Sequence, residues 1–216
     1  IADGPRSIMT HSRWEISAVL LTGLGNFVLA DWLGLRLAFV VGACLFWMGF
    51  VAIRASADAS VLGEWGFTTR NLGRSLGLLA PVAVLAVFVF IAYGMFTGSL
   101  FMHWHVGLIF PLYCVWGLVQ QFLIVALLAG NLRKLSRIQE RWIVLLTAFL
   151  FAVAHAASIP LMGAAFFLAV VTTTVYSRTR NIWALGLFHG VFATGLYYFA
   201  LGQDLWAEVV SARMWP

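Results

Sequence analysis

The chain has 216 residues, of which 62% are hydrophobic and only 10% are charged. Soluble domains average about 45–50% apolar and about 25% charged residues, and a soluble fold of this size has too little interior to bury the surplus. The composition excludes a soluble enzyme, a disordered chain and a nucleic-acid-binding module. It predicts an all-α, polytopic membrane helix bundle in contact with the lipid bilayer.

Seven apolar runs are expected to form transmembrane helices, each of which needs roughly 20 residues. In chain order they cover residues 14–30, 37–53, 75–97, 107–130, 142–158, 161–176 and 182–201. The first two runs are joined by a short connector and are expected to form a peripheral hairpin. Pro160 separates the fifth run from the sixth, because proline interrupts a helix and restricts the residue before it.

Basic residues are divided unequally between the two ends of these runs. Eleven lie before the first run or in every second connector: Arg6, Arg13, Arg54, Arg70, Arg74, Arg133, Lys134, Arg137, Arg141, Arg178 and Arg180. Only Arg36 and Arg213 lie on the opposite side. Because cytoplasmic loops carry the excess of Lys and Arg, we predict a cytoplasmic N-terminus. The predicted location is the bacterial inner (cytoplasmic) membrane, and the net charge of +5 reflects topology rather than a nucleic-acid partner.

The chain divides into three predicted parts. Residues 1–64 form an N-terminal segment with the hairpin, residues 65–201 form the membrane core, and residues 202–216 form an interfacial tail. The tail mixes Trp and Leu with charged residues, which is typical of an amphipathic helix on a membrane surface. Residues 54–74 are the only long polar connector, and we expect a surface loop there with a short interfacial helix.

Four polar side chains within the apolar runs are candidates for a functional site. Gln120 and Gln121 are in the fourth run, His155 is near the end of the fifth, and His189 is near the middle of the seventh. Burial of a polar group in a membrane is costly, so each needs a partner or a function. Hydrogen bonding between helices accounts for a single Gln pair or a single His. The depths of all four side chains also allow them to line one cavity.

The order and spacing of these residues resemble the CPBP family of intramembrane endopeptidases, which includes the CAAX-processing and bacteriocin-processing proteases. The family pattern is a glutamate pair with an arginine four residues on, then F-x-x-x-H, then H-x-x-x-N, on successive membrane helices. The segment GLVQQFLIVALL has Gln120 and Gln121 at the glutamate positions and Val125 at the arginine position. The resemblance covers roughly residues 65–200 and is best over residues 108–200.

The two later motifs are better preserved. The segment FAVAH supplies Phe151 and His155, whereas the third motif has His189 but Ala193 at the asparagine position. In the family, a glutamate is thought to activate water, and the His and Asn residues position that base or stabilise the oxyanion. The resemblance therefore marks Gln120, Gln121, His155 and His189 as the catalytic motif positions, but it carries over no carboxylate base.

Three hypotheses of different classes follow. The first, which we favour, is a proteolytically inactive CPBP-like pseudoenzyme that binds a membrane partner or acts as an accessory or structural subunit, with no cofactor or metal. The second is an active intramembrane endopeptidase in which His155 or His189 is the base, because neutral imidazole can accept a proton and an amide cannot. Loss of cleavage in the His155→Ala or His189→Ala variant would distinguish the second hypothesis from the first.

The third hypothesis is a cofactor site. A membrane His beside small residues can ligate haem iron or the metal of a pigment, so His155 and His189 are the candidate ligands. His103 and His105, in the connector before the fourth run, are candidates to join His155 in binding a metal ion. A colourless, metal-free preparation would contradict this hypothesis.

Overall fold

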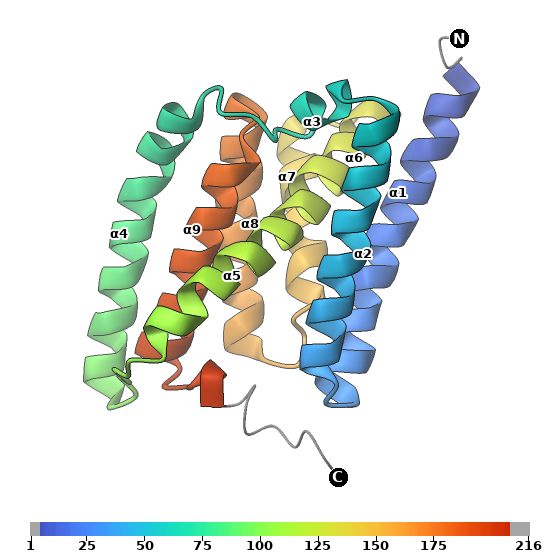
Figure 1. Cartoon of the computed structure of the whole chain (residues 1–216). Coiled ribbons are helices and arrows are strands. Elements are labelled where there is room, and N and C mark those ends of the chain that lie inside the picture. Colours follow the sequence, from blue (N-terminus) through green and yellow to red (C-terminus); the bar gives the residue numbers. More distant parts are fainter. Residues whose placement is uncertain (1–4, 208–216) are drawn as a thin grey trace.

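A computed structural model describes residues 5–207, with side chains described from residue 11 onward. This part of the chain is a bundle of helices, so the predicted all-α class is confirmed (Figure 1). The helices are, in chain order, α1 (Pro5–Gly25), η1 (Asn26–Trp32), α2 (Arg36–Ala57), α3 (Ser60–Glu64), α4 (Leu72–Thr97), α5 (Val106–Gln121), η2 (Phe122–Leu128), α6 (Ala129–Leu135), α7 (Glu140–Val153), α8 (Ile159–Thr179), α9 (Ile182–Gly195) and η3 (Leu196–Ala200).

Five helical rods within the described residues are long and apolar enough to cross a membrane. They are α2, α4, the continuous helix α5–η2–α6 (Val106–Leu135), α8, and the continuous helix α9–η3 (Ile182–Ala200). Each coincides with one of the predicted runs. The chain is therefore an integral membrane protein, whereas the total of seven spans and the cytoplasmic N-terminus stay predictions.

The fifth predicted run is shorter than expected. Helix α7 ends at Val153, at a length of about 21 Å for 14 residues at 1.5 Å per residue. The chain then turns, and His155 lies in this turn rather than within a helix. Pro160 stands at the start of α8, where the hydroxyl of Ser158 accepts a hydrogen bond from the backbone N–H of Leu161 at 3.4 Å. The turn exists because this cap and proline start a new helix at Ile159.

The connectors rich in basic residues meet at one end of the bundle. The side-chain amide of Asn181 donates to the backbone oxygens of Thr68 at 2.6 Å and Arg70 at 3.0 Å. Asn71 donates to the backbone oxygen of Thr179 at 3.1 Å. The connector between α2 and α4, which contains the predicted short helix as α3, is therefore fastened to the α8–α9 turn.

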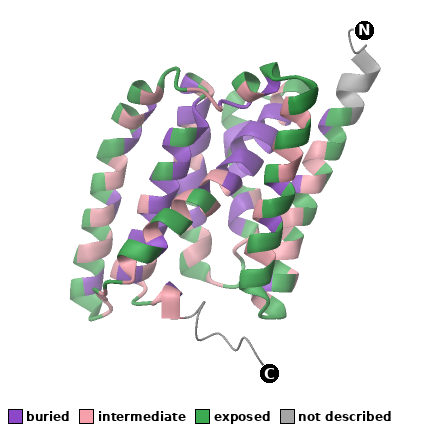
Figure 2. Ribbon diagram, viewed as in Figure 1, coloured by how far each residue is buried: buried purple, intermediate pink, exposed green. Residues whose placement is uncertain are grey.

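The pairing of α5 with α9 forms the centre of the bundle. A Cβ on Gly186 would lie 2.9 Å from the Cβ of Leu118, and a Cβ on Gly190 would lie 3.0 Å from the backbone nitrogen of Cys114. Only glycine allows the two helix backbones to approach so closely. Because the G-x-x-x-G spacing places both glycines on one face of α9, the close contact extends over two turns. Figure 2 shows buried residues gathered on α9 and on the part of the chain that continues α5 into η2, while the outer surfaces of α2 and α4 are exposed.

The N-terminal helices lie at one edge of the bundle (Figure 1). Helix α1 contacts η2 and α6, while η1 contacts α2. At the basic end, Asn131 donates to the carboxylate of Glu15 at 2.7 Å, which ties α6 to α1. The division into three parts stays a prediction, and of the predicted tail helix residues 208–216 lie outside the described residues.

Candidate functional site

Gln121 and His189 meet at the α5–α9 contact. The Gln121 side chain is fully buried and His189 is 4% exposed. The amide Nε2 of Gln121 lies 3.1 Å from Nδ1 of His189. An amide nitrogen only donates, so Nδ1 is the acceptor and a neutral His189 ring carries its proton on Nε2.

A glycine one turn before Gln121 makes this contact feasible. A Cβ on Gly117 would lie 2.8 Å from both Cβ and Cγ of His189. Any larger residue at position 117 would push α9 away from α5. Directly after Gln121 the helix widens into the π-helical turn η2, and widened turns of this kind are frequent at functional sites.

His155 is oriented by the helix that precedes it. Its Nδ1 donates to the backbone oxygen of Phe151 at 2.8 Å, which leaves Nε2 of a neutral ring without a proton. The Phe151 ring is edge-on to both imidazoles, with centroids 4.7 Å from His155 and 6.2 Å from His189. Phe151 is thus a shared packing partner for the two histidines.

The motif residues line a small cavity. The cavity has a volume of about 60 Å³, and its lining includes Gln120, Phe151, His155, His189 and Ala193. The expectation that these polar side chains can line one cavity is confirmed for Gln120, His155 and His189. Gln121 is buried behind His189 and is absent from the lining described for this cavity.

A larger cavity adjoins the small one. It has a volume of about 390 Å³ and shares Trp116, Gln120, Phe151 and His155 with the small cavity. Its other wall comes from α1 and η1. In that wall Asn26 donates to the backbone oxygen of Ala154 at 3.0 Å, so the N-terminal rod is fixed to the His155 turn.

The polar residues that line the small cavity are an amide, two imidazoles and two tyrosines, Tyr113 and Tyr197. The described lining of both cavities includes neither Asp nor Glu. Val125, at the family's arginine position, is fully buried, and Ala193, at the asparagine position, is 7% exposed. The side-chain oxygen of Gln121 has no hydrogen-bond partner among the described residues. The site therefore offers hydrogen bonds, and a proton acceptor at the Nε2 atom of His155.

The segment that carries these motifs was compared with known protein families. Residues 103–195 match the family model described as type II CAAX prenyl endopeptidase Rce1-like. This confirms the resemblance to the CPBP family over that segment, which contains all four motif residues. Neither the curated proteins nor the solved structures include a match to the chain. This segment of the membrane-embedded chain is therefore similar to CAAX proteases, while the roles of Gln120, Gln121, His155 and His189 stay predictions.

The metal ligand set predicted from His103, His105 and His155 does not form. His155 is in the turn after α7, whereas His103 and His105 lie beside Asp204, which follows η3. No residue pattern pointed to Asp204, since 99 positions separate it from His105. The only available signal was topological, because both connectors were expected on the same side of the membrane.

Proposed function

We propose that the protein is a CAAX-protease-like pseudoenzyme of the bacterial inner membrane that binds a membrane partner instead of cleaving a substrate. The observation that carries the proposal is the lining of the cavity where the motif positions meet. That lining combines amide, imidazole and tyrosine side chains and includes no carboxylate among the described residues. Binding of a partner as an accessory or structural subunit requires the cavity and its hydrogen bonds, but not a general base.

The differences between this chain and the family's motif are consistent with one another. A general base contributes typically 10²–10⁴-fold to a rate, and one oxyanion donor contributes about 10²–10³-fold. Loss of both the general base and an oxyanion donor leaves little catalysis. The fully buried position of Val125 also supports a coordinated change, because a buried arginine without carboxylates would be an unpaired charge.

The larger cavity supports a binding role. Its volume of about 390 Å³ is within the usual range for ligand-binding cavities, roughly 300–1,000 Å³. Most of its lining is apolar, and its polar side chains include those of Thr22, Asn26, Gln120 and His155. This combination fits an apolar membrane segment whose backbone or side chain offers one or two hydrogen bonds.

The second candidate is an active endopeptidase with histidine chemistry, and one observation favours it. Because Nδ1 of His155 donates to Phe151, its Nε2 is free of a proton and is the better base. Nδ1 of His189 is already occupied by Gln121, so its protonated Nε2 is better suited to donate to an oxyanion. This candidate predicts unequal roles for the two histidines, with His155 accepting the proton.

A cleavage assay separates the two candidates. The purified chain in nanodiscs is incubated with a fluorescence-quenched prenylated CAAX peptide, beside His155→Ala and His189→Ala variants. The pseudoenzyme predicts equal, background signals from all three proteins. Cleavage by the unaltered chain that falls in the His155→Ala variant would overturn the proposal and support the second candidate.

A crosslinking experiment tests partner binding directly. A photo-crosslinking residue replaces Phe27, which lines the larger cavity, and a matched variant carries it at the lipid-facing Phe88 of α4. We expect one defined protein adduct in native membranes from position 27 and only lipid adducts from position 88. Identical adducts at both positions would contradict a partner in the cavity.

A further inference from the structure

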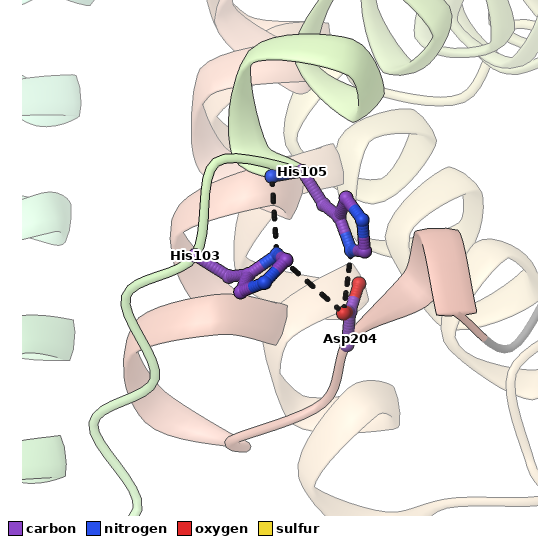
Figure 3. Close-up of side chains that lie close together, drawn as sticks. All are labelled: His103, His105 and Asp204. Atoms are coloured by element: carbon purple, nitrogen blue, oxygen red, sulfur yellow. Dashed lines mark hydrogen bonds and ion pairs between the residues drawn. The ribbon is translucent and has the colours of Figure 1, made fainter.

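A second histidine cluster lies away from the membrane cavity. His103 precedes α5 in the connector after α4, His105 is the residue before α5, and Asp204 follows η3 (Figure 3). Nδ1 of His105 lies 2.7 Å from Oδ2 of Asp204, and Nδ1 of His103 lies 4.0 Å from the same oxygen. One potential ligand atom from each of the three residues lies within 4.8 Å of the other two.

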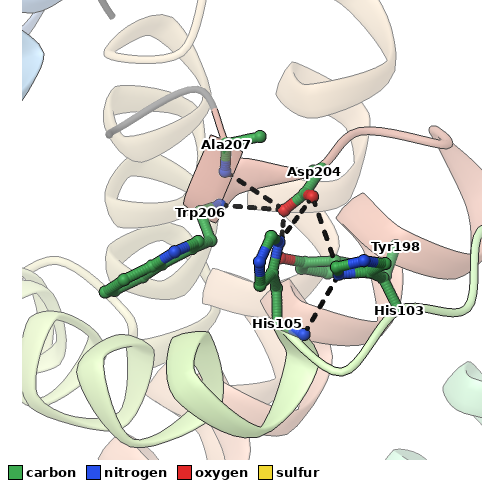
Figure 4. A network of polar contacts seen from close by, with 6 residues as sticks. All are labelled: His103, His105, Tyr198, Asp204, Trp206 and Ala207. Atoms are coloured by element: carbon green, nitrogen blue, oxygen red, sulfur yellow. Dashed lines mark hydrogen bonds and ion pairs between the residues drawn. The ribbon is translucent and has the colours of Figure 1, made fainter. Parts of the chain in front are cut away.

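The other oxygen of Asp204 is held in place by three donors. Oδ1 accepts hydrogen bonds from the Tyr198 hydroxyl at 2.8 Å and from the backbone N–H groups of Trp206 at 3.1 Å and Ala207 at 3.3 Å (Figure 4). These donors fix the carboxylate so that Oδ2 faces the two imidazoles. Supporting contacts that orient a ligating carboxylate in this way are a regular feature of protein metal sites.

The two imidazoles are also oriented by their surroundings. The backbone N–H of His105 donates to Nδ1 of His103 at 3.4 Å, so that nitrogen carries a lone pair rather than a proton. The ring of Phe101 stacks on His103 with a centroid distance of 5.7 Å. Phe101 is in turn fixed by its backbone N–H, which donates to the backbone oxygen of Tyr198 at 2.9 Å. The two connectors therefore hold each other in place.

We propose that His103, His105 and Asp204 bind one divalent transition-metal ion of the zinc class. Imidazole nitrogen and carboxylate oxygen are common zinc ligands at about 2.0–2.2 Å, and three protein ligands leave a coordination position open to water or substrate. Neighbouring ligand atoms in such a tetrahedron are about 3.3 Å apart. The distances of 2.7 and 4.0 Å lie on either side of that value, so small side-chain rotations suffice.

The side chains are accessible enough to load an ion from solution. The exposed fractions are 36% for His103, 17% for His105 and 16% for Asp204. Since these residues are separate from the motif positions, the site does not depend on whether the protein cleaves peptides. In the bound state the ion would replace the His105–Asp204 hydrogen bond and the 3.4 Å contact between the His105 backbone N–H and Nδ1 of His103. It would join the connector before α5 to the segment after η3.

Zinc titration of the full chain tests the site. Tag-free protein in detergent is dialysed against chelator, and Zn²⁺ binding is measured by calorimetry, with Co²⁺ absorption as a second readout of the ligand set. We expect one ion per chain. Affinity should fall by at least about tenfold in the His103→Ala and Asp204→Asn variants. The His155→Ala variant is the matched control and should bind as the unaltered chain does.

Two results would overturn the proposal. One is the absence of Zn²⁺ and Co²⁺ binding by the unaltered, correctly folded chain, which would make the cluster a hydrogen-bonded clasp between connectors. The other is binding that the His103→Ala variant retains unchanged. His103 is in a connector and is the most exposed of the three, so this variant tests the site even if Asp204→Asn fails to fold.

Discussion

Helix α2 and the continuous helix α5–η2–α6 have the same mean hydropathy but opposite surroundings. Only 6% of the residues in the apolar stretch of α2 are buried, compared with 67% in α5–η2–α6. In water, both helices would have to bury their apolar side chains inside the protein. In a bilayer the lipid tails are as apolar as leucine, so a helix can face lipid without that burial. Hydropathy therefore identifies helices that enter the membrane, and it does not say which of them face protein.

The difference between these helices arises from small and polar residues. Gly117 and Gln121 give α5 a face on which a second helix can approach and form a hydrogen bond, and Gly186 and Gly190 give α9 the matching face. Glycines of α2 such as Gly49 have nothing within 4 Å of a Cβ position. Packing complementarity, rather than apolar content, decides which helices form the centre of the bundle.

The largest contrast is expected from shortening one leucine in each region. Leu185 of α9 is fully buried, whereas Leu45 of α2 is 66% exposed. Leu185→Ala should lower the free energy of unfolding by about 2–5 kcal/mol because it opens a cavity. Leu45→Ala should have an effect within about 0.5 kcal/mol. Thermal unfolding in one detergent measures both variants, and equal losses would contradict the assignment of α2 to the lipid-facing surface.

Adding one methyl group tests the same comparison in the opposite direction. Gly190→Ala places a Cβ against Cys114 and should destabilise the protein by about 1–3 kcal/mol through overpacking. Gly49→Ala meets open space in α2 and should stabilise it by up to about 1 kcal/mol, since alanine favours a helix. Melting temperatures that move in the same direction in both variants would be evidence against the close α5–α9 approach.

The two glutamines are expected to differ in their effect on stability. Gln121→Leu removes the partner of Nδ1 of the buried His189 and should cost about 1–3 kcal/mol. Gln120 is half-buried and lines a cavity, so Gln120→Leu should cost less. Chemical or thermal unfolding of the two variants compares them. A larger loss in Gln120→Leu would indicate that the hydrogen bond to His189 contributes little.

The smallest effect is expected at the basic end of the bundle. Arg133 donates from Nε to Glu140 at 2.9 Å, and this hydrogen bond holds the pKa of Glu140 below its usual range. A carboxyl pKa that is lowered in the folded state stabilises that state at pH values above the pKa of the unfolded state. This contribution is lost as the pH falls through the pKa of the folded state. The Glu140 side chain is 46% exposed, so Glu140→Gln should cost less than about 1 kcal/mol at neutral pH.

The pH dependence provides the control for this ion pair. The difference in stability between Glu140→Gln and the unaltered chain should begin to shrink as pH falls below the ordinary glutamate pKa of about 4.3. It should disappear at still lower pH, once the carboxyl is protonated in the folded state as well. Unfolding followed at neutral and acidic pH measures this change. A difference that stays constant across the range would assign the effect to packing instead of charge.

Much of the fold was predictable because membrane insertion depends on local composition. The five long apolar helices coincide with predicted runs, and the connector between α2 and α4 has the expected short helix. The end of the fifth run was wrong at residues 154–158. Hydropathy continued through Val153 and Ala154, whereas a turn and the Ser158 cap decided where α7 ended and α8 began.

The sequence by itself determined that this protein is a membrane helix bundle, and the spacing of Gln120, Phe151, His155 and His189 indicated the CPBP-like segment. Tertiary structure alone decided which atoms meet. Gln121 bonds to His189 while Gln120 lines the cavity, because adjacent residues on a helix point about 100° apart. Likewise, Asp204 joins His103 and His105 because chain topology brings distant connectors together, and no local pattern encodes that pairing.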